Sequence, residues 1–166
     1  MLANLLNVDA LHPLMVHFPI ALLLVAPVFV ILAIAWKRNE LPISITALIL
    51  MALGTIGAFV AAASGEAAED NVSGAAARAV LDRHEDLATT VEITFSALTL
   101  LFAALLFLPR LFHHPLRRLT MVSATIVFLG LYLAGAILLA VAAHQGGRLV
   151  HEFGVRSPVT ALIPGT

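Results

Sequence analysis

Two histidines and two prolines stand close together where the first apolar segment begins, in residues 11–22, which read LHPLMVHFPIAL. Imidazole is a good ligand for haem iron, copper, zinc and non-haem iron. A membrane-spanning segment carries histidine only near the interface or where another group satisfies it. His12 and His17 are therefore the first candidates for chemistry. We expect the rest of the chain to bring partners to them.

The further candidates are histidines and acids near the ends of the other apolar segments: His84, His144, His151, Glu66, Glu85 and Glu92. Glu92 lies within an apolar segment, where an ionisable group usually faces the interior of a helical bundle and a partner. Glu85, Thr89, Glu92 and Ser96 are spaced by four, three and four residues, so they share one face of a helix.

Composition identifies the class of protein. The chain has 166 residues, of which 61% are hydrophobic, with a mean hydropathy of +1.02. Residues 12–36, 41–65, 87–109 and 119–146 each have the length of about 20 apolar residues that spans a bilayer. We predict an all-α integral membrane protein, a single four-helix bundle over residues 1–166. In the connection 66–86, a helix from residue 75 is expected to run unbroken into the third span.

Absent features exclude several chemistries. The sequence has no cysteine, which excludes disulfides, iron–sulfur clusters, thiolate zinc sites and covalently attached c-type haem. It has no basic patch with interleaved aromatic residues, so nucleic-acid binding is not expected.

Charge predicts the orientation of the bundle. The two short loops between spans carry Lys37, Arg38 and Glu40 in one and Arg110, Arg117 and Arg118 in the other. By the positive-inside rule these loops are cytoplasmic. Both termini and five of the seven histidines would then lie outside. For a bacterial inner-membrane protein, this places the candidate site on the periplasmic side.

Helix rise, about 1.5 Å per residue, allows depth to be counted along each predicted span. Counted from the basic loops, His17 and Glu92 lie roughly 28 and 25 Å away, and His12, His84 and His144 roughly 36–37 Å away. The candidates thus form two layers close to one membrane surface. Their convergence predicts a shared site.

Small residues and prolines predict how the helices pack. Pro19 and Pro27 fall inside the first span, where each removes a backbone hydrogen bond, and neighbouring helices are expected to satisfy the freed carbonyls. Gly57, Ala61 and Gly65 form a small-residue stripe for close packing, which also permits a homodimer.

The fourth span carries its own spacing pattern. Tyr132, Ala136, Ala140 and His144 are four residues apart, which predicts a groove below the histidine. The pair at positions 146 and 147, both glycine, is expected to break the helix.

The opening LHPLMVHFPIAL and the closing His144-Gln-Gly-Gly-Arg-Leu-Val resemble a family of small bacterial four-helix membrane proteins, catalogued as domain of unknown function two-two-three-one. The resemblance extends over nearly the whole chain and includes Ser64-Gly-Glu66 and His84-Glu85. Some relatives are fused to c-type cytochrome or Rieske-type modules, which implies electron transfer at the outer face. His151 stands where the family is expected to carry tyrosine, and Phe153 where histidine is common.

Our leading hypothesis is a redox protein in the lipid bilayer that binds b-type haem through two of four histidines, His12, His17, His84 and His144. The favoured pairs are His84 with His144 and His17 with His144, and Arg148 is a candidate for a propionate. Its expected partner is a periplasmic c-type cytochrome or Rieske-type carrier.

Two alternatives remain open. The first is a non-haem zinc or copper site drawn from His17, His84, His144, His151, Glu66, Glu85 and Glu92. The second is a structural or assembly subunit without a cofactor. The sequence assigns no enzymatic reaction.

Overall fold

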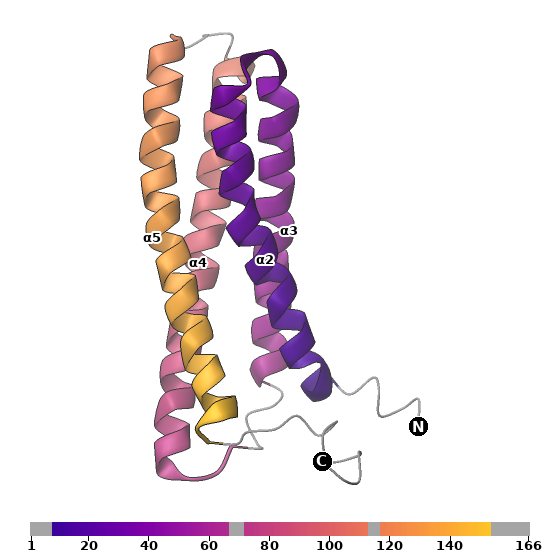
Figure 1. The fold of residues 1–166 in the computed structure, drawn as a ribbon, viewed down its shortest axis with the longest axis vertical. Coiled ribbons are helices and arrows are strands. Elements are labelled where there is room, and N and C mark those ends of the chain that lie inside the picture. The colour runs from indigo at the N-terminus through magenta and orange to yellow at the C-terminus, as the bar shows by residue number, and fades with distance from the viewer. Residues whose placement is uncertain (1–7, 67–71, 113–116, 154–166) are drawn as a thin grey trace.

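The computed structural model describes residues 8–66, 72–112 and 117–153, which form four long helices (Figure 1). They are α2 (Val8–Ala35), α3 (Glu40–Glu66), α4 (Ala75–Leu111) and α5 (Arg118–His151), with the short 3-10 helix η1 (Lys37–Asn39) between α2 and α3. Each of the four described helices is long and apolar enough to cross a membrane. The predicted all-α membrane bundle is confirmed.

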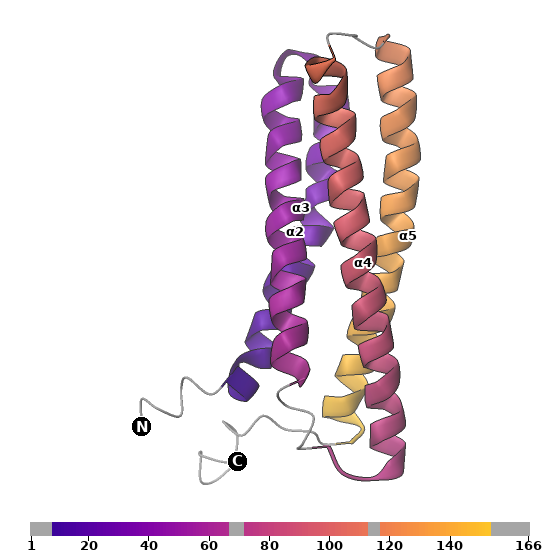
Figure 2. The same cartoon turned by 180° about the vertical axis from the view of Figure 1, so that it is seen from behind.

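The helices run alternately up and down in a ring, seen from the front in Figure 1 and from behind in Figure 2. The most extensive contact is between α2 and α3, followed by that between α4 and α5. Helices α3 and α4 are also neighbours in the ring, and so are α2 and α5. Each helix is therefore packed against two neighbours.

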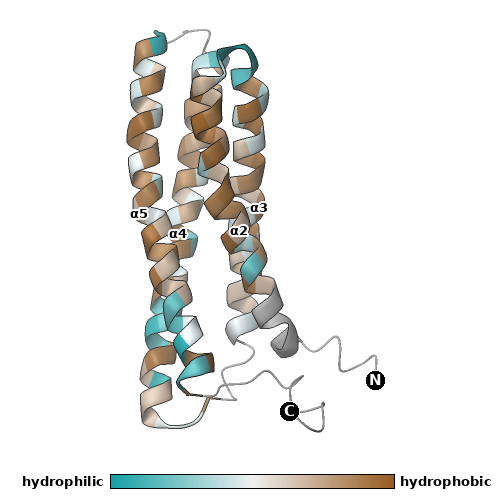
Figure 3. Cartoon of the chain, in the orientation of Figure 1, coloured by the Kyte–Doolittle hydropathy of each residue, from teal (hydrophilic) through white to brown (hydrophobic). Residues whose placement is uncertain are grey.

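The two ends of the bundle differ in polarity, as Figure 3 shows by hydropathy. We call one the basic end, defined by five cations on and beside η1, the end of α4 and the start of α5: Lys37, Arg38, Arg110, Arg117 and Arg118. The opposite end, where α2 and α4 begin and α3 and α5 end, is the histidine end. There α4 and α5 carry most of the hydrophilic colour, while the middle of every helix is apolar.

The core is built from a few large side chains of the inward-facing stripes. Phe95 and Tyr132 meet edge to face at 5.4 Å between ring centres, and Phe102 and Phe128 stack at 5.0 Å. Such aromatic pairs add to what burial alone contributes. Many other apolar side chains, such as Ile93 and Leu100, are exposed on the outside, as expected of a surface that faces lipid.

Helices α2 and α3 approach closely because the contacting face of α3 is made of small residues. A Cβ atom on Gly54 would lie 2.7 Å from Leu23 Cγ, and one on Gly57 would lie 3.1 Å from Pro19 Cβ. The packing role predicted for the small-residue stripe is thus confirmed at Gly57. Its partner there is α2 of the same chain, so Gly57 gives no support for the homodimer.

Helices α4 and α5 are longer than the spans expected from the sequence. Helix α4 has 37 residues and runs unbroken from Ala75, which confirms the predicted continuous helix. The predicted break at Gly146 and Gly147 is wrong, because α5 continues through both glycines to His151. Measured from the Thr55–Thr99 hydrogen bond, α3 ends level with Ala88, so the first turns of α4 extend beyond α3.

Candidate functional site

His84 lies on the part of α4 that extends beyond α3, and its ring is held against α5. Its Nδ1 atom lies 2.9 Å from the carbonyl oxygen of Ala142. Because a carbonyl oxygen only accepts, Nδ1 carries the hydrogen and donates it. In the neutral ring, Nε2 then bears the lone pair. This is the tautomer in which metal-ligating histidines are commonly held.

Gly146 gives the His84 ring its place. A Cβ atom on Gly146 would lie 3.0 Å from His84 Cε1 and 3.5 Å from both ring nitrogens, whereas nothing lies within 4 Å of such an atom on Gly147. Packing against α4 also explains why α5 does not break at this glycine. Glycine at position 146 therefore makes room for the His84 ring and does not form a turn.

The polar stripe of α4 lies on the side of that helix that meets α3. Thr99 continues the stripe by one turn, and its hydroxyl is 3.1 Å from that of Thr55 on α3. Glu85 and Glu92 lie on the same face, two turns apart, and one carboxylate oxygen of each is shielded from solvent. The predicted stripe therefore places two half-buried acids on the face of α4 that carries Thr99.

The end of α5 carries an exposed ion pair. Arg148 binds both carboxylate oxygens of Glu152, with distances of 2.9–3.0 Å, and also donates to Gln145 at 3.1 Å. The hydrogen bonds from Arg148 lower the pKa of the Glu152 carboxyl, and the charges of Arg148 and His144 act in the same direction. Arg148, the predicted propionate ligand, thus already has a carboxylate partner. His151 is exposed beside this pair.

His144 is exposed, and the structure does not bring it to His84. It stands two residues from both Ala142 and Gly146, which is about 200° around the helix from the face that meets His84. Residues four apart drift by about 40° per step, so three steps from Tyr132 carry His144 about 120° away. Tyr132 is buried in the core while His144 is exposed, so the predicted alignment of these residues on one face is wrong.

The two histidines of α2 can be located only by their level along the bundle. His17 is exposed at the level of Leu138 on α5, counted six residues from the Tyr132–Leu23 contact on each helix. By the same count the backbone of His12 is about level with Ala142, the residue that His84 contacts. The side chains of His12 and Glu66 lie outside the described residues.

Tyr132 has a role that the sequence did not assign. Its hydroxyl donates to the carbonyl oxygen of Leu23 at 2.7 Å, inside the core. Within α2 that carbonyl would be bonded by the N–H of residue 27, but residue 27 is proline and has none. The expectation that a neighbouring helix satisfies a carbonyl freed by proline is thus confirmed for Pro27. The signal was Pro27 four residues after Leu23, which identifies the acceptor but not the donor.

In sum, the structure joins His84 to α5 and places Glu85 and Glu92 on one face of α4, but it leaves His17, His144 and His151 exposed. Within the described ranges 8–66, 72–112 and 117–153, no three histidine, aspartate or glutamate side chains are grouped closely enough to hold one metal ion. The geometry therefore favours His84 on α4 as the first ligand of any cofactor or metal site.

Comparison with known proteins identifies a family. Neither the curated proteins nor the solved structures include one that matches this chain. A family described as predicted membrane protein (DUF2231) matches residues 8–158, which covers all four described helices. The chain therefore belongs to this family of predicted membrane proteins, DUF2231.

Proposed function

We propose that the histidine end holds a b-type haem with His84 as one axial ligand, and that the protein transfers electrons there. The observation that carries the proposal is the hydrogen bond from His84 Nδ1 to the Ala142 carbonyl. It fixes the tautomer, orients the ring and leaves the Nε2 lone pair available for iron. A histidine held in this way needs no rearrangement of its own to become a ligand.

The second axial ligand is proposed to come from α2. His12 lies about level with the contact that holds His84, and His17 lies about 7 Å farther toward the middle of the bundle. His144 is less suited because it is exposed on the far side of α5 from His84. Arg148 already bonds Glu152 through Nε and Nη2 and Gln145 through Nη1, so a propionate would compete with these partners for its guanidinium.

The orientation belongs to the same proposal. The basic end carries five cations and one acid, Glu40, which supports a cytoplasmic location for this end in a bacterial inner membrane. The histidine end would then face the periplasm. The partner proposed there is a c-type cytochrome or a Rieske-type carrier, as the fusions of family members imply.

The test is the colour of the purified full-length protein. Cells supplied with a haem precursor should yield protein with a Soret band and, in the reduced-minus-oxidised spectrum, an α band. His84→Ala should lower the haem content more than about tenfold, since loss of even an outer-shell partner has an effect of that size. His151→Ala, at an exposed position on α5, is the matched control. Wild-type protein without these bands would overturn the haem proposal.

A second candidate is a zinc or copper site that uses His84 with acids of α4. The observation that favours it is Glu85, which lies in the same turn of α4 as His84 and has one carboxylate oxygen shielded from solvent. Imidazole and carboxylate together suit such ions. Glu85 directly follows His84 in α4, so the two side chains leave the helix about 100° apart, and one helix would supply both an imidazole and a carboxylate.

Elemental analysis separates the two candidates. About one zinc or copper per chain, lost in Glu85→Gln and in His84→Ala, would support the non-haem site. One haem iron per chain, retained in Glu85→Gln, would support the haem. A colourless and metal-free protein whose His84→Ala variant differs only in the partners it retains would support the cofactor-free structural subunit instead.

A further inference from the structure

A groove opens at the basic end between α2 and α5. It has a volume of about 260 Å³. It is lined by the end of α2, by η1, by the start of α3 and by one face of the first two turns of α5: Ile34, Lys37, Glu40, Arg118, Met121, Val122 and Thr125. Helices α2 and α5 make less contact than the other adjoining pairs, which leaves room for it.

The groove is amphipathic. Lys37 and Arg118 line it from two different helices, while Ile34, Met121 and Val122 supply an apolar wall. The first turns of α5 also contribute the partial positive charge of a helix N-terminus. An occupant that fits both parts carries a negative charge beside a hydrocarbon chain.

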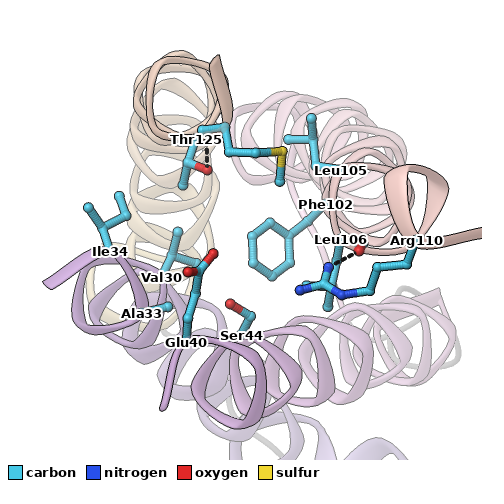
Figure 4. A pocket seen from close by; sticks show the side chains of 11 residues that line it. Val30, Ala33, Ile34, Glu40, Ser44, Phe102, Leu105, Leu106, Arg110 and Thr125 are labelled. Carbon is cyan, nitrogen blue, oxygen red and sulfur yellow. Dashed lines mark hydrogen bonds between the residues drawn. The ribbon is translucent and has the colours of Figure 1, made fainter. Parts of the chain in front are cut away.

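A smaller cavity of about 40 Å³ adjoins the groove and shares Ile34, Glu40, Met121 and Thr125 with it (Figure 4). Its view shows Glu40 and Arg110 on opposite sides, with Phe102 between them. The Arg110 guanidinium donates to the carbonyl of Leu106. Among the described residues that line the two spaces, Glu40 is the one acid, against three cations, Lys37, Arg110 and Arg118.

We propose that this groove binds the headgroup of an anionic phospholipid, with its phosphodiester between Lys37 and Arg118 and an acyl chain along Ile34, Met121 and Val122. The charge at this end is complementary to such a headgroup, because the basic end has five cations and a single acid among the described residues. Trp36, which is 60% exposed next to Lys37, has the amphipathic ring that is typical of the membrane interface. The groove therefore lies at headgroup level, and basic pockets between helices are known to bind such headgroups.

The proposal is tested by native mass spectrometry of the full-length protein in detergent, with phosphatidylglycerol or phosphatidylcholine added. We expect phosphatidylglycerol to be retained in preference to phosphatidylcholine. The double variant K37Q/R118Q should weaken this preference roughly 30-fold, since each basic side chain beside an anionic headgroup contributes about fivefold. The matched control R78Q/R83Q removes two exposed arginines from α4 at the histidine end and should bind as the wild type does.

Further measurements keep the outcome unambiguous. K37R retains the charge and should retain the lipid, which separates loss of charge from loss of fold. Inorganic phosphate at millimolar concentration should not displace phosphatidylglycerol, because it has no acyl chain to bind the apolar wall. Equal retention of the two lipids, equal loss in both double variants, or displacement by phosphate alone would each overturn the proposal.

Discussion

Between α2 and α3, apolar side chains of α2 pack directly against glycine backbone of α3: Leu23 lies against Gly54, and Pro19 lies against Gly57. Between α4 and α5 the contact also includes a histidine bonded to a main-chain carbonyl, His84 to Ala142. Helices α2 and α3 are held together by close packing of apolar groups. Helices α4 and α5 are held by close packing and also by a hydrogen bond. Substitutions in the first should therefore act through volume, and those in the second through hydrogen bonding.

The largest effect is expected from added volume between α2 and α3. Gly54→Leu would place a side chain where even a Cβ lies 2.7 Å from Leu23 Cγ, so the helices must separate. Overpacking of this kind should lower the free energy of unfolding by about 3 kcal/mol. Gly130→Leu is the control, because Gly130 is exposed and nothing lies within 4 Å of its added Cβ. Equal losses for both variants in reversible unfolding in micelles would refute the shape-based account.

A smaller effect is expected from Tyr132→Phe, which removes the hydrogen bond between α5 and α2. The Leu23 carbonyl would lose its donor in the core, so the free energy of unfolding should fall by about 1 kcal/mol. Pro27→Ala restores an N–H in α2. In a double-mutant cycle, Tyr132→Phe should therefore cost less in the Pro27→Ala background. An unchanged cost would show that the proline is not the reason for the bond.

The two neighbouring glycines of α5 should respond differently to alanine. Gly147→Ala has open space and should stabilise the helix by up to about 1 kcal/mol. Gly146→Ala should lose this gain, because its Cβ would lie 3.0 Å from His84 Cε1 and displace the ring. Nitrogen NMR of the His84 ring should show the Nδ1–H tautomer in wild type and Gly147→Ala. A Gly146→Ala protein with the same ring signals would contradict the contact.

The smallest effect concerns pH at the exposed end of α5. Because Arg148 lowers the pKa of Glu152 in the folded chain, the pair contributes stability above the pKa of the unfolded carboxyl. That contribution is lost as pH falls through the lowered folded value. Carboxyl NMR titration should show the Glu152 pKa returning toward its ordinary range in Arg148→Gln. A titration curve identical to that of the wild type would argue against the pair in solution.

The sequence was sufficient for the parts of the fold that depend on composition and spacing. Apolar length predicted four helices, and the stripe of small residues predicted close packing at Gly57. Spacings of four, three and four residues placed Glu85 and Glu92 on one face of α4, because these steps nearly complete whole turns.

Other features depend on tertiary contacts that spacing alone does not determine. His84 and His144 agree in depth, but depth says nothing about direction around a helix, and the structure turns His144 to the outside. Two adjacent glycines predict a helix break at Gly146, although its neighbour is an imidazole from α4. The donor for the Leu23 carbonyl lies 109 residues away in the chain, beyond any local pattern.

The bond between Tyr132 and the carbonyl above Pro27 has a consequence for the order of assembly. Helix α2 is synthesised before α5 and enters the bilayer with the Leu23 carbonyl oxygen left without a hydrogen bond from its own helix. The Tyr132 hydroxyl that bonds this oxygen is synthesised only with α5. A chain cut before residue 132 should therefore insert its earlier helices but leave the Leu23 carbonyl without a donor. Helix α5 would thus supply the hydrogen bond that α2 cannot make for itself.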